Sequence, residues 1–192
     1  MKYFFFCLAV AGVLVGCRDG TGPADPLAPS GHLEFSYEGN EIAGAFSATG
    51  PMDTRTFTYG TWAAATTDGT GINIVSLTAH DNWKADMVGI FLPGVSGTGT
   101  FALGGPTCDA PDPTCRDGEF LVNFDYRSLL GNTTVSPPDA FFVIREGTLT
   151  IASNDGERIR GSFSGTAVYD GEEGPWTIAI RDGSFDVPLV RR

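Results

Sequence analysis

Large apolar residues recur at every second position through most of this chain, and this period is what most restricts its fold. Side chains alternate between the two faces of a strand, so a period of two predicts β-structure. No window of eleven residues beyond the first seventeen shows a helical stripe. The expected strands are residues 33–37, 42–48, 57–62, 72–77, 87–92, 100–103, 120–126, 141–151, 159–169 and 176–187.

Turn dipeptides separate several of these strands: Asp68-Gly69, Asp117-Gly118, Asp155-Gly156 and Asp170-Gly171. Short strands at this spacing predict an all-β fold, either an antiparallel β-sandwich or a closed barrel of about nine or ten strands. Gly147 and Gly183 stand inside long strand patterns. We expect a bulge or a sharp bend at each, where a long strand crosses from one sheet to another or turns a barrel corner.

Residues 120–126 show the alternation most clearly and predict part of the core. One face is expected to point inward, and it carries Phe120, Val122, Phe124 and Tyr126. The other face carries Leu121, Asn123 and Asp125, and we expect Asn123 and Asp125 to face water.

The first residues have the pattern of an export signal. Lys2 precedes an apolar run over residues 3–15, which is shorter than a membrane-spanning helix needs. Leu14-Val15-Gly16-Cys17 resembles the lipobox of bacterial lipoproteins. That resemblance implies cleavage after residue 16, a diacylglyceryl group on the Cys17 thiol and an acylated, palmitate-type amino terminus.

The residues after Cys17 bear on where the chain is held. An aspartate directly after the lipidated cysteine marks inner-membrane retention in well-studied lipoproteins, and Arg18 stands there instead. The resemblance therefore implies the outer membrane, without saying which face. Residues 17–31 are rich in Gly and Pro and are expected to be a flexible linker, which leaves residues 32–192 as a single domain.

The C-terminal third is similar to the ending of a family of uncharacterised bacterial envelope lipoproteins. The likeness rests on residues 147–151, 159–167 and 182–188. It implies one all-β domain in the cell envelope, and it brings no catalytic or binding residues.

Cys108 and Cys115 remain once the cysteines at positions 7 and 17 are assigned to the export segment and the lipid. In an exported chain, two such cysteines predict a disulfide. The same stretch is acidic, with Asp109, Asp112, Asp117 and Glu119. Calcium takes oxygen ligands of this kind, but the spacing fits no EF-hand pattern, and a solvated acidic loop is the simpler interpretation.

Residues 80–86 hold a second group of candidates, His80, Asp81, Trp83 and Asp86, between two expected strands. An exposed ring beside carboxylates can stack on a sugar, and these residues are the candidate ligand site. The alternative is that Trp83 folds back over the end of the core. Trp62 and Trp176 lie within strand patterns and are expected in the core.

The net charge of −11 disfavours nucleic acid, whose affinity for proteins depends on Lys and Arg. No cofactor motif is present, and neither His32 nor His80 has a catalytic constellation near it in the sequence.

We therefore expect a lipid-anchored envelope protein with a structural or binding role and no enzymatic activity. Its expected partners are the membrane, through the anchor, and an envelope protein or a glycan. Two alternatives stay open: a carbohydrate- or small-ligand-binding module of a surface uptake system, and a hydrolase whose site is assembled from distant segments.

Overall fold

The structure, a computed structural model, describes residues 29–39, 42–52, 61–79, 85–104, 118–124, 140–171 and 174–191. All regular elements in these ranges are strands, which confirms the predicted all-β fold. The strands are β1 (Ser30–Gly39), β2 (Ile42–Pro51), β3 (Trp62–Thr67), β4 (Gly71–Ala79), β5 (Ala85–Pro93), β6 (Gly99–Leu103), β7 (Glu119–Phe124), β8 (Ala140–Asn154), β9 (Arg158–Gly171) and β10 (Gly174–Arg191). None of the described residues belongs to a helix long and apolar enough to cross a membrane.

Seven strands close into a barrel in the order β10-β3-β4-β5-β7-β8-β9, with β9 returning to β10. The other three extend this ring: β1 and then β2 add to the side of β10, and β6 adds to β8. Paired strands run antiparallel except β10 and β3, which are parallel over Leu189–Arg191. The sequence left a sandwich and a barrel open, and the fold has features of both.

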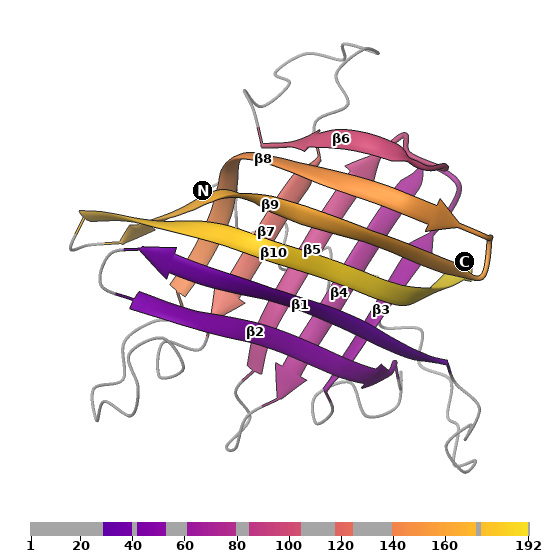
Figure 1. Ribbon diagram of the computed structural model, residues 1–192, viewed down its shortest axis with the longest axis horizontal. Coiled ribbons are helices and arrows are strands. Elements are labelled where there is room, and N and C mark those ends of the chain that lie inside the picture. Colours follow the sequence, from indigo (N-terminus) through magenta and orange to yellow (C-terminus); the bar gives the residue numbers. More distant parts are fainter. Residues whose placement is uncertain are drawn as a thin grey trace.

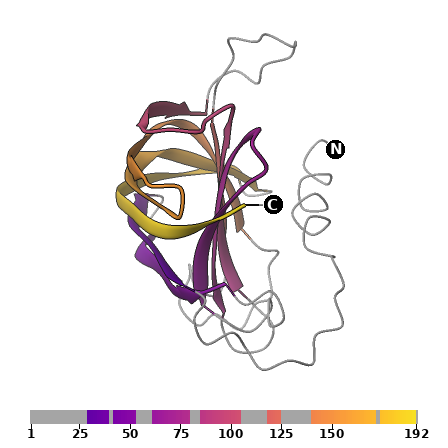
Figure 2. The ribbon, with the colours of Figure 1, turned by 90° about the vertical axis from the view of Figure 1, so that its right-hand side faces the viewer.

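The two layers meet along β8 and β10, because each of these long strands takes part in both. In β8, residues up to Val143 pair with β7, whereas residues from Gly147 pair with β6. In β10, residues up to Asp186 pair with β1, whereas residues from Leu189 pair with β3. Figures 1 and 2 show the result, with β6, β8, β9, β10, β1 and β2 crossing over β7, β5, β4 and β3.

The bend predicted at Gly147 is present. The register of β8 shifts between Ile144 and Glu146, directly before its partner changes. A Cβ at Gly147 would lie 2.6 Å from the Ile144 Cδ1 atom, so the close packing at this corner requires glycine. Gly183 lies at a bulge next to Asp182, which has a φ of 53°. The strand nevertheless changes sheets only later, after Asp186.

The core lies between the layers and is rich in aromatic rings. The inward face predicted for β7 is confirmed for its described residues, since Phe120, Val122 and Phe124 are all buried. Phe35 of β1 stacks on Phe46 with ring centroids 5.2 Å apart and also contacts Phe120 and Phe124. On the opposite face of β7, the Asn123 Oδ1 atom is buried and not in water as expected.

In the described residues the third strand runs from Trp62 to Thr67, beyond the end of the strand expected at residues 57–62. Residues 57–60 lie outside the described part of the chain. Alanine is uncommon in strands, and so Ala63, Ala64 and Ala65 give no strand signal in the sequence. The strand is stabilised by its pairing with β4, which compensates for the low strand preference of these alanines.

The two tryptophans expected in the core differ in how far they are buried and in which cluster they join. Trp62 is buried, but it belongs with Ala64 and Leu77 to a small cluster separate from the main core. Trp176 is partly buried and packs against the main core. At the N-terminal side, Ser30 and Gly31 belong to β1 and not to the linker expected over residues 17–31.

Candidate functional site

Most of the site residues proposed from the sequence lie outside the described ranges, and their predicted roles stay predictions. These residues are Cys17 for lipidation, Cys108 and Cys115 for the disulfide, His80, Asp81 and Trp83 for ligand binding, and Asp109, Asp112 and Asp117 for calcium. The fourth calcium candidate, Glu119, is exposed at the start of β7. In the part of the chain that can be described, no group of three acidic, His or Cys side chains is arranged to hold a metal.

Asp86, the remaining ligand candidate, faces the barrel interior. It is only 7% exposed and lies opposite Thr78 in the β4–β5 pair. Its charge reaches the phenol of Tyr37: burial and the Asp86 carboxylate together raise the pKa of Tyr37 above 10.0. Tyr37 is therefore neutral at physiological pH.

A second polar side chain lies inside the barrel near this end. The Ser76 Oγ atom is fully buried and has no hydrogen-bond partner among the described residues. Ser76 stands opposite Ala63 on one side and Val88 on the other, both of which are buried. Together with Asp86 and Tyr37, it makes this end of the interior more polar than the aromatic centre.

His32 lies on the outer face of β1, between a carboxylate and a hydroxyl. Its Nδ1 atom is 2.6 Å from the Thr49 Oγ1 atom, and its Nε2 atom is 3.3 Å from the Glu34 Oε2 atom. Thr49 is directly opposite His32 in the sheet, and Glu34 is two residues away on the same face. Neighbours at these positions meet on any antiparallel sheet, so the contacts follow from register and do not argue for catalysis.

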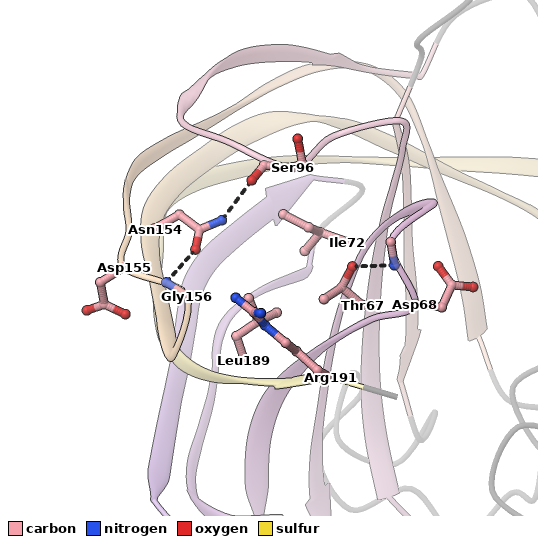
Figure 3. A pocket seen from close by; sticks show the side chains of 10 residues that line it. Thr67, Asp68, Ile72, Ser96, Asn154, Asp155, Gly156, Leu189 and Arg191 are labelled. Carbon is pink, nitrogen blue, oxygen red and sulfur yellow. Dashed lines mark hydrogen bonds between the residues drawn. The ribbon is translucent and has the colours of Figure 1, made fainter.

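A cavity opens at the other end of the barrel, where three turns and the end of β10 converge (Figure 3). Its volume is about 600 Å³, within the range of small-molecule sites. The lining consists of Thr67, Asp68, Gly69, Ile72, Ser96, Asn154, Asp155, Gly156, Leu189 and Arg191. Ile72 and Leu189 form its apolar part, and the other side chains form a polar rim.

The β3–β4 turn forms one side of the rim and is held by its own side chains. The Asp68 Oδ1 atom accepts hydrogen bonds from the Thr70 hydroxyl at 2.6 Å and the Thr70 amide at 2.8 Å. These bonds lower the pKa of Asp68 below 3.8, so its carboxylate is ionised at neutral pH. The Thr67 hydroxyl donates to the Gly71 carbonyl at 2.6 Å and is also occupied.

The β8–β9 turn forms the opposite side of the rim, and it is also held by hydrogen bonds to its own aspartate. The Asp155 Oδ1 atom accepts the amides of Arg158 at 2.7 Å and Glu157 at 3.0 Å, which lower the pKa of Asp155 below 3.8. Asn154 joins this turn to the β5–β6 connection, because its Nδ2 atom donates to the Ser96 carbonyl at 3.1 Å.

The C-terminal part of β10 closes the site from below. Its position depends on the parallel pairing with β3 and on the Leu189 amide, which donates to the Glu157 carbonyl at 2.7 Å. This places Leu189 in the lining and brings Arg191 to the mouth of the cavity (Figure 3).

Sequence reasoning missed this cavity. It identified the turns at Asp68-Gly69 and Asp155-Gly156 but had no signal that they meet at one end of the barrel. Comparisons of this chain with protein-family models, with curated proteins and with solved structures gave no match.

Proposed function

We propose that this chain is a lipid-anchored binding protein of the cell envelope that holds a small ligand at one mouth of its β-barrel. The observation that carries the binding role is the cavity of about 600 Å³ between the turns, lined by apolar Ile72 and Leu189 and by a polar rim. Ligand sites are concave, mostly apolar and equipped with a few fixed polar groups, and they occur in the mouths of β-barrels.

The position of the ligand follows from how the interior is filled. Large side chains occupy the centre of the barrel, among them the rings of Phe35, Phe120, Phe142 and Phe163. A ligand is therefore held at the mouth and does not pass into the centre.

The chemistry of the lining favours binding over catalysis. It offers aliphatic groups, hydroxyls, an amide, two carboxylates and a guanidinium, and both carboxylates are engaged by their own turns. None of the lining residues within the described ranges is aromatic. A sugar stacked on a ring is thus less well supported here than another small ligand.

The envelope location rests on the N-terminal sequence alone. Residues 1–16 as an export signal and Cys17 as the lipid-bearing residue put the domain on a tether, with the flexible linker predicted over residues 17–31. We propose the outer membrane, because Arg18 follows the cysteine. A binding domain of this kind suits a surface uptake system.

A thermal-shift screen of small molecules against the purified chain tests the binding role. A ligand at a hundred times its Kd stabilises a protein by about 2.7 kcal/mol, which raises the Tm of a domain this size by about 5–10 °C. The screen is repeated on Ser96→Trp, which places a large ring at the mouth, and on the control Ser162→Trp, on an exposed position of β9.

We expect hits that stabilise the wild type and Ser162→Trp but not Ser96→Trp. Hits that stabilise all three proteins equally, or a diverse library without any hit, would contradict a ligand site at this mouth.

A further inference from the structure

Arg191 is the only cationic residue among the described residues that line the cavity. Its side chain extends from the end of β10 across the mouth toward Gly156 and Asn154 (Figure 3). No ion pair or hydrogen bond joins its guanidinium to another residue in the described ranges. Arg181, by contrast, is paired at 2.6 Å with Glu38 on the outer face.

The two carboxylates of the rim do not neutralise Arg191. Both point away from the mouth in Figure 3. Asp68 is held by Thr70, and Asp155 is held by the amides of its own turn and lies 4.0 Å from Arg160. The guanidinium thus presents its donors to the cavity while the nearest acids face outward.

Leu189 lies below the Arg191 side chain and Ile72 lies above it in Figure 3, and both contribute only hydrocarbon to the lining. A ligand that satisfies both parts of the site has an anionic head and an apolar body. Guanidinium groups bind carboxylates with two parallel hydrogen bonds, which are stronger than bonds between neutral groups. The Ser96 hydroxyl at the rim offers one more donor.

The charge of the whole chain limits the anion to one of low charge. At −11 overall, and with Asp68 and Asp155 near the mouth, the field around the site repels phosphates and other polyanions. A single carboxylate meets the Arg191 donors with the least repulsion.

Building on the binding role proposed above, we propose that the ligand is a monocarboxylate with an apolar body, whose carboxylate pairs with Arg191 and whose hydrocarbon part lies on Ile72 and Leu189.

Two probes that share a hydrocarbon body test this proposal: hexanoate and 1-hexanol. They are titrated against the ¹⁵N-labelled full chain in lipid nanodiscs, and binding is followed by the amide resonances of Ser96 and Gly156. These amides report on the mouth, and each affinity is calculated from the free aqueous concentration of the probe, because partitioning into lipid lowers that concentration. The variant is Arg191→Gln, and the matched control is Arg181→Gln.

We expect hexanoate to bind at least about tenfold more tightly than hexanol to the wild type and to Arg181→Gln, a ratio that corresponds to about 1.4 kcal/mol. Arg191→Gln is expected to abolish the preference while leaving hexanol binding unchanged.

Equal affinity for the two probes, or a preference that survives Arg191→Gln, would overturn the proposal while leaving a ligand site at the mouth. If neither probe shifts the amides saturably, the monocarboxylate assignment is wrong. The Ser96→Trp screen then decides the binding role separately.

Discussion

Arg158 on β9 donates two hydrogen bonds to Asp186 on β10, from Nε to the carboxylate at 2.7 Å and from Nη2 to the main-chain carbonyl at 3.1 Å. Arg160 contacts the second carboxylate oxygen at 3.1 Å. Partial burial raises the pKa of Asp186, but the hydrogen bonds and charges of the two arginines outweigh it, and the net pKa lies below 3.8. This network joins β9 and β10 on the outer face.

The stability that Asp186 supplies is expected to depend on pH. A carboxylate whose pKa is lowered by folding stabilises the folded state above its ordinary pKa, and the effect is lost as pH falls through the folded value. Because the side chain is 44% exposed, we expect Asp186→Asn to cost only about 0.5–1 kcal/mol at pH 7. Urea unfolding at pH 7, 5, 4 and 3 should show this difference shrinking below pH 3.8.

Val190→Ala is the control, because this exposed residue of the same strand has no titratable or hydrogen-bonding side chain. A wild-type to Asp186→Asn difference that is as large at pH 3 as at pH 7 would contradict the assigned ionisation.

Because of Tyr37, we expect the folded protein to lose stability in alkaline solution. Its pKa is raised by burial and by the charge of Asp86, so the unfolded chain releases the phenolic proton at a lower pH than the folded protein does. Above about pH 10, stability should fall by at most about 1.4 kcal/mol per pH unit for this one proton. Tyr37→Phe removes this term and should lose less stability than the wild type between pH 9 and 11, measured by urea unfolding. An equal loss of stability in the wild type and in Tyr37→Phe would contradict the raised pKa of Tyr37.

Gly44 is expected to tolerate no side chain. It lies opposite Tyr37, and a Cβ there would be 2.7 Å from the Cζ atom of the ring. Gly44→Ala should therefore displace the ring and destabilise the fold by about 1–3 kcal/mol. Ala43→Gly, at the exposed neighbouring position, is the comparison and should cost less than about 1 kcal/mol in thermal unfolding. Similar Tm values for Gly44→Ala and the wild type would show that the ring moves freely.

Phe124→Ala should be among the most damaging core substitutions. The ring is 1% exposed and contacts Tyr37 at 4.8 Å and Phe142 at 5.9 Å between centroids. Removing a buried Phe side chain costs about 3–5 kcal/mol. Glu119→Ala, at the exposed start of the same strand, should change stability by less than about 0.5 kcal/mol in thermal circular dichroism. We also expect little effect from Asp125→Ala, at a position outside the described residues; a loss equal to that of Phe124→Ala would show that this aspartate is buried and paired.

Cys17 and the pair Cys108 and Cys115 are open to direct chemical tests. Cys17→Ser should abolish incorporation of labelled fatty acid and leave an uncleaved or mis-sorted precursor. Incorporation at the wild-type level would disprove the anchor. For the pair, intact mass after export should be lower by two hydrogens than after reduction, and labelling of either thiol without reduction would disprove the disulfide.

Local patterns predicted the strands well, because alternation reports which way each side chain points once a strand forms. Phe120, Val122 and Phe124 are buried as expected, and the bend at Gly147 is present. Alternation fails where small residues replace large ones, as at Ala63–Ala65 in β3. Alternation also does not predict that the Asn123 Oδ1 atom is buried. Burial of a side chain on the outer face depends on which residues cover that face, and its own strand does not determine this.

Closure of the barrel and the cavity at its mouth both depend on which strands pair. The local sequence pattern does not indicate which strands pair. The parallel pairing of Arg191 with Thr67 joins positions more than a hundred residues apart and completes the seven-stranded ring. The same pairing brings Arg191 between the turns of Asp68 and Asp155, each of which is recognisable from its own residues. The strands and turns thus follow from local backbone and side-chain preferences, whereas the candidate site arises only when long-range pairing brings three turns and one strand end together.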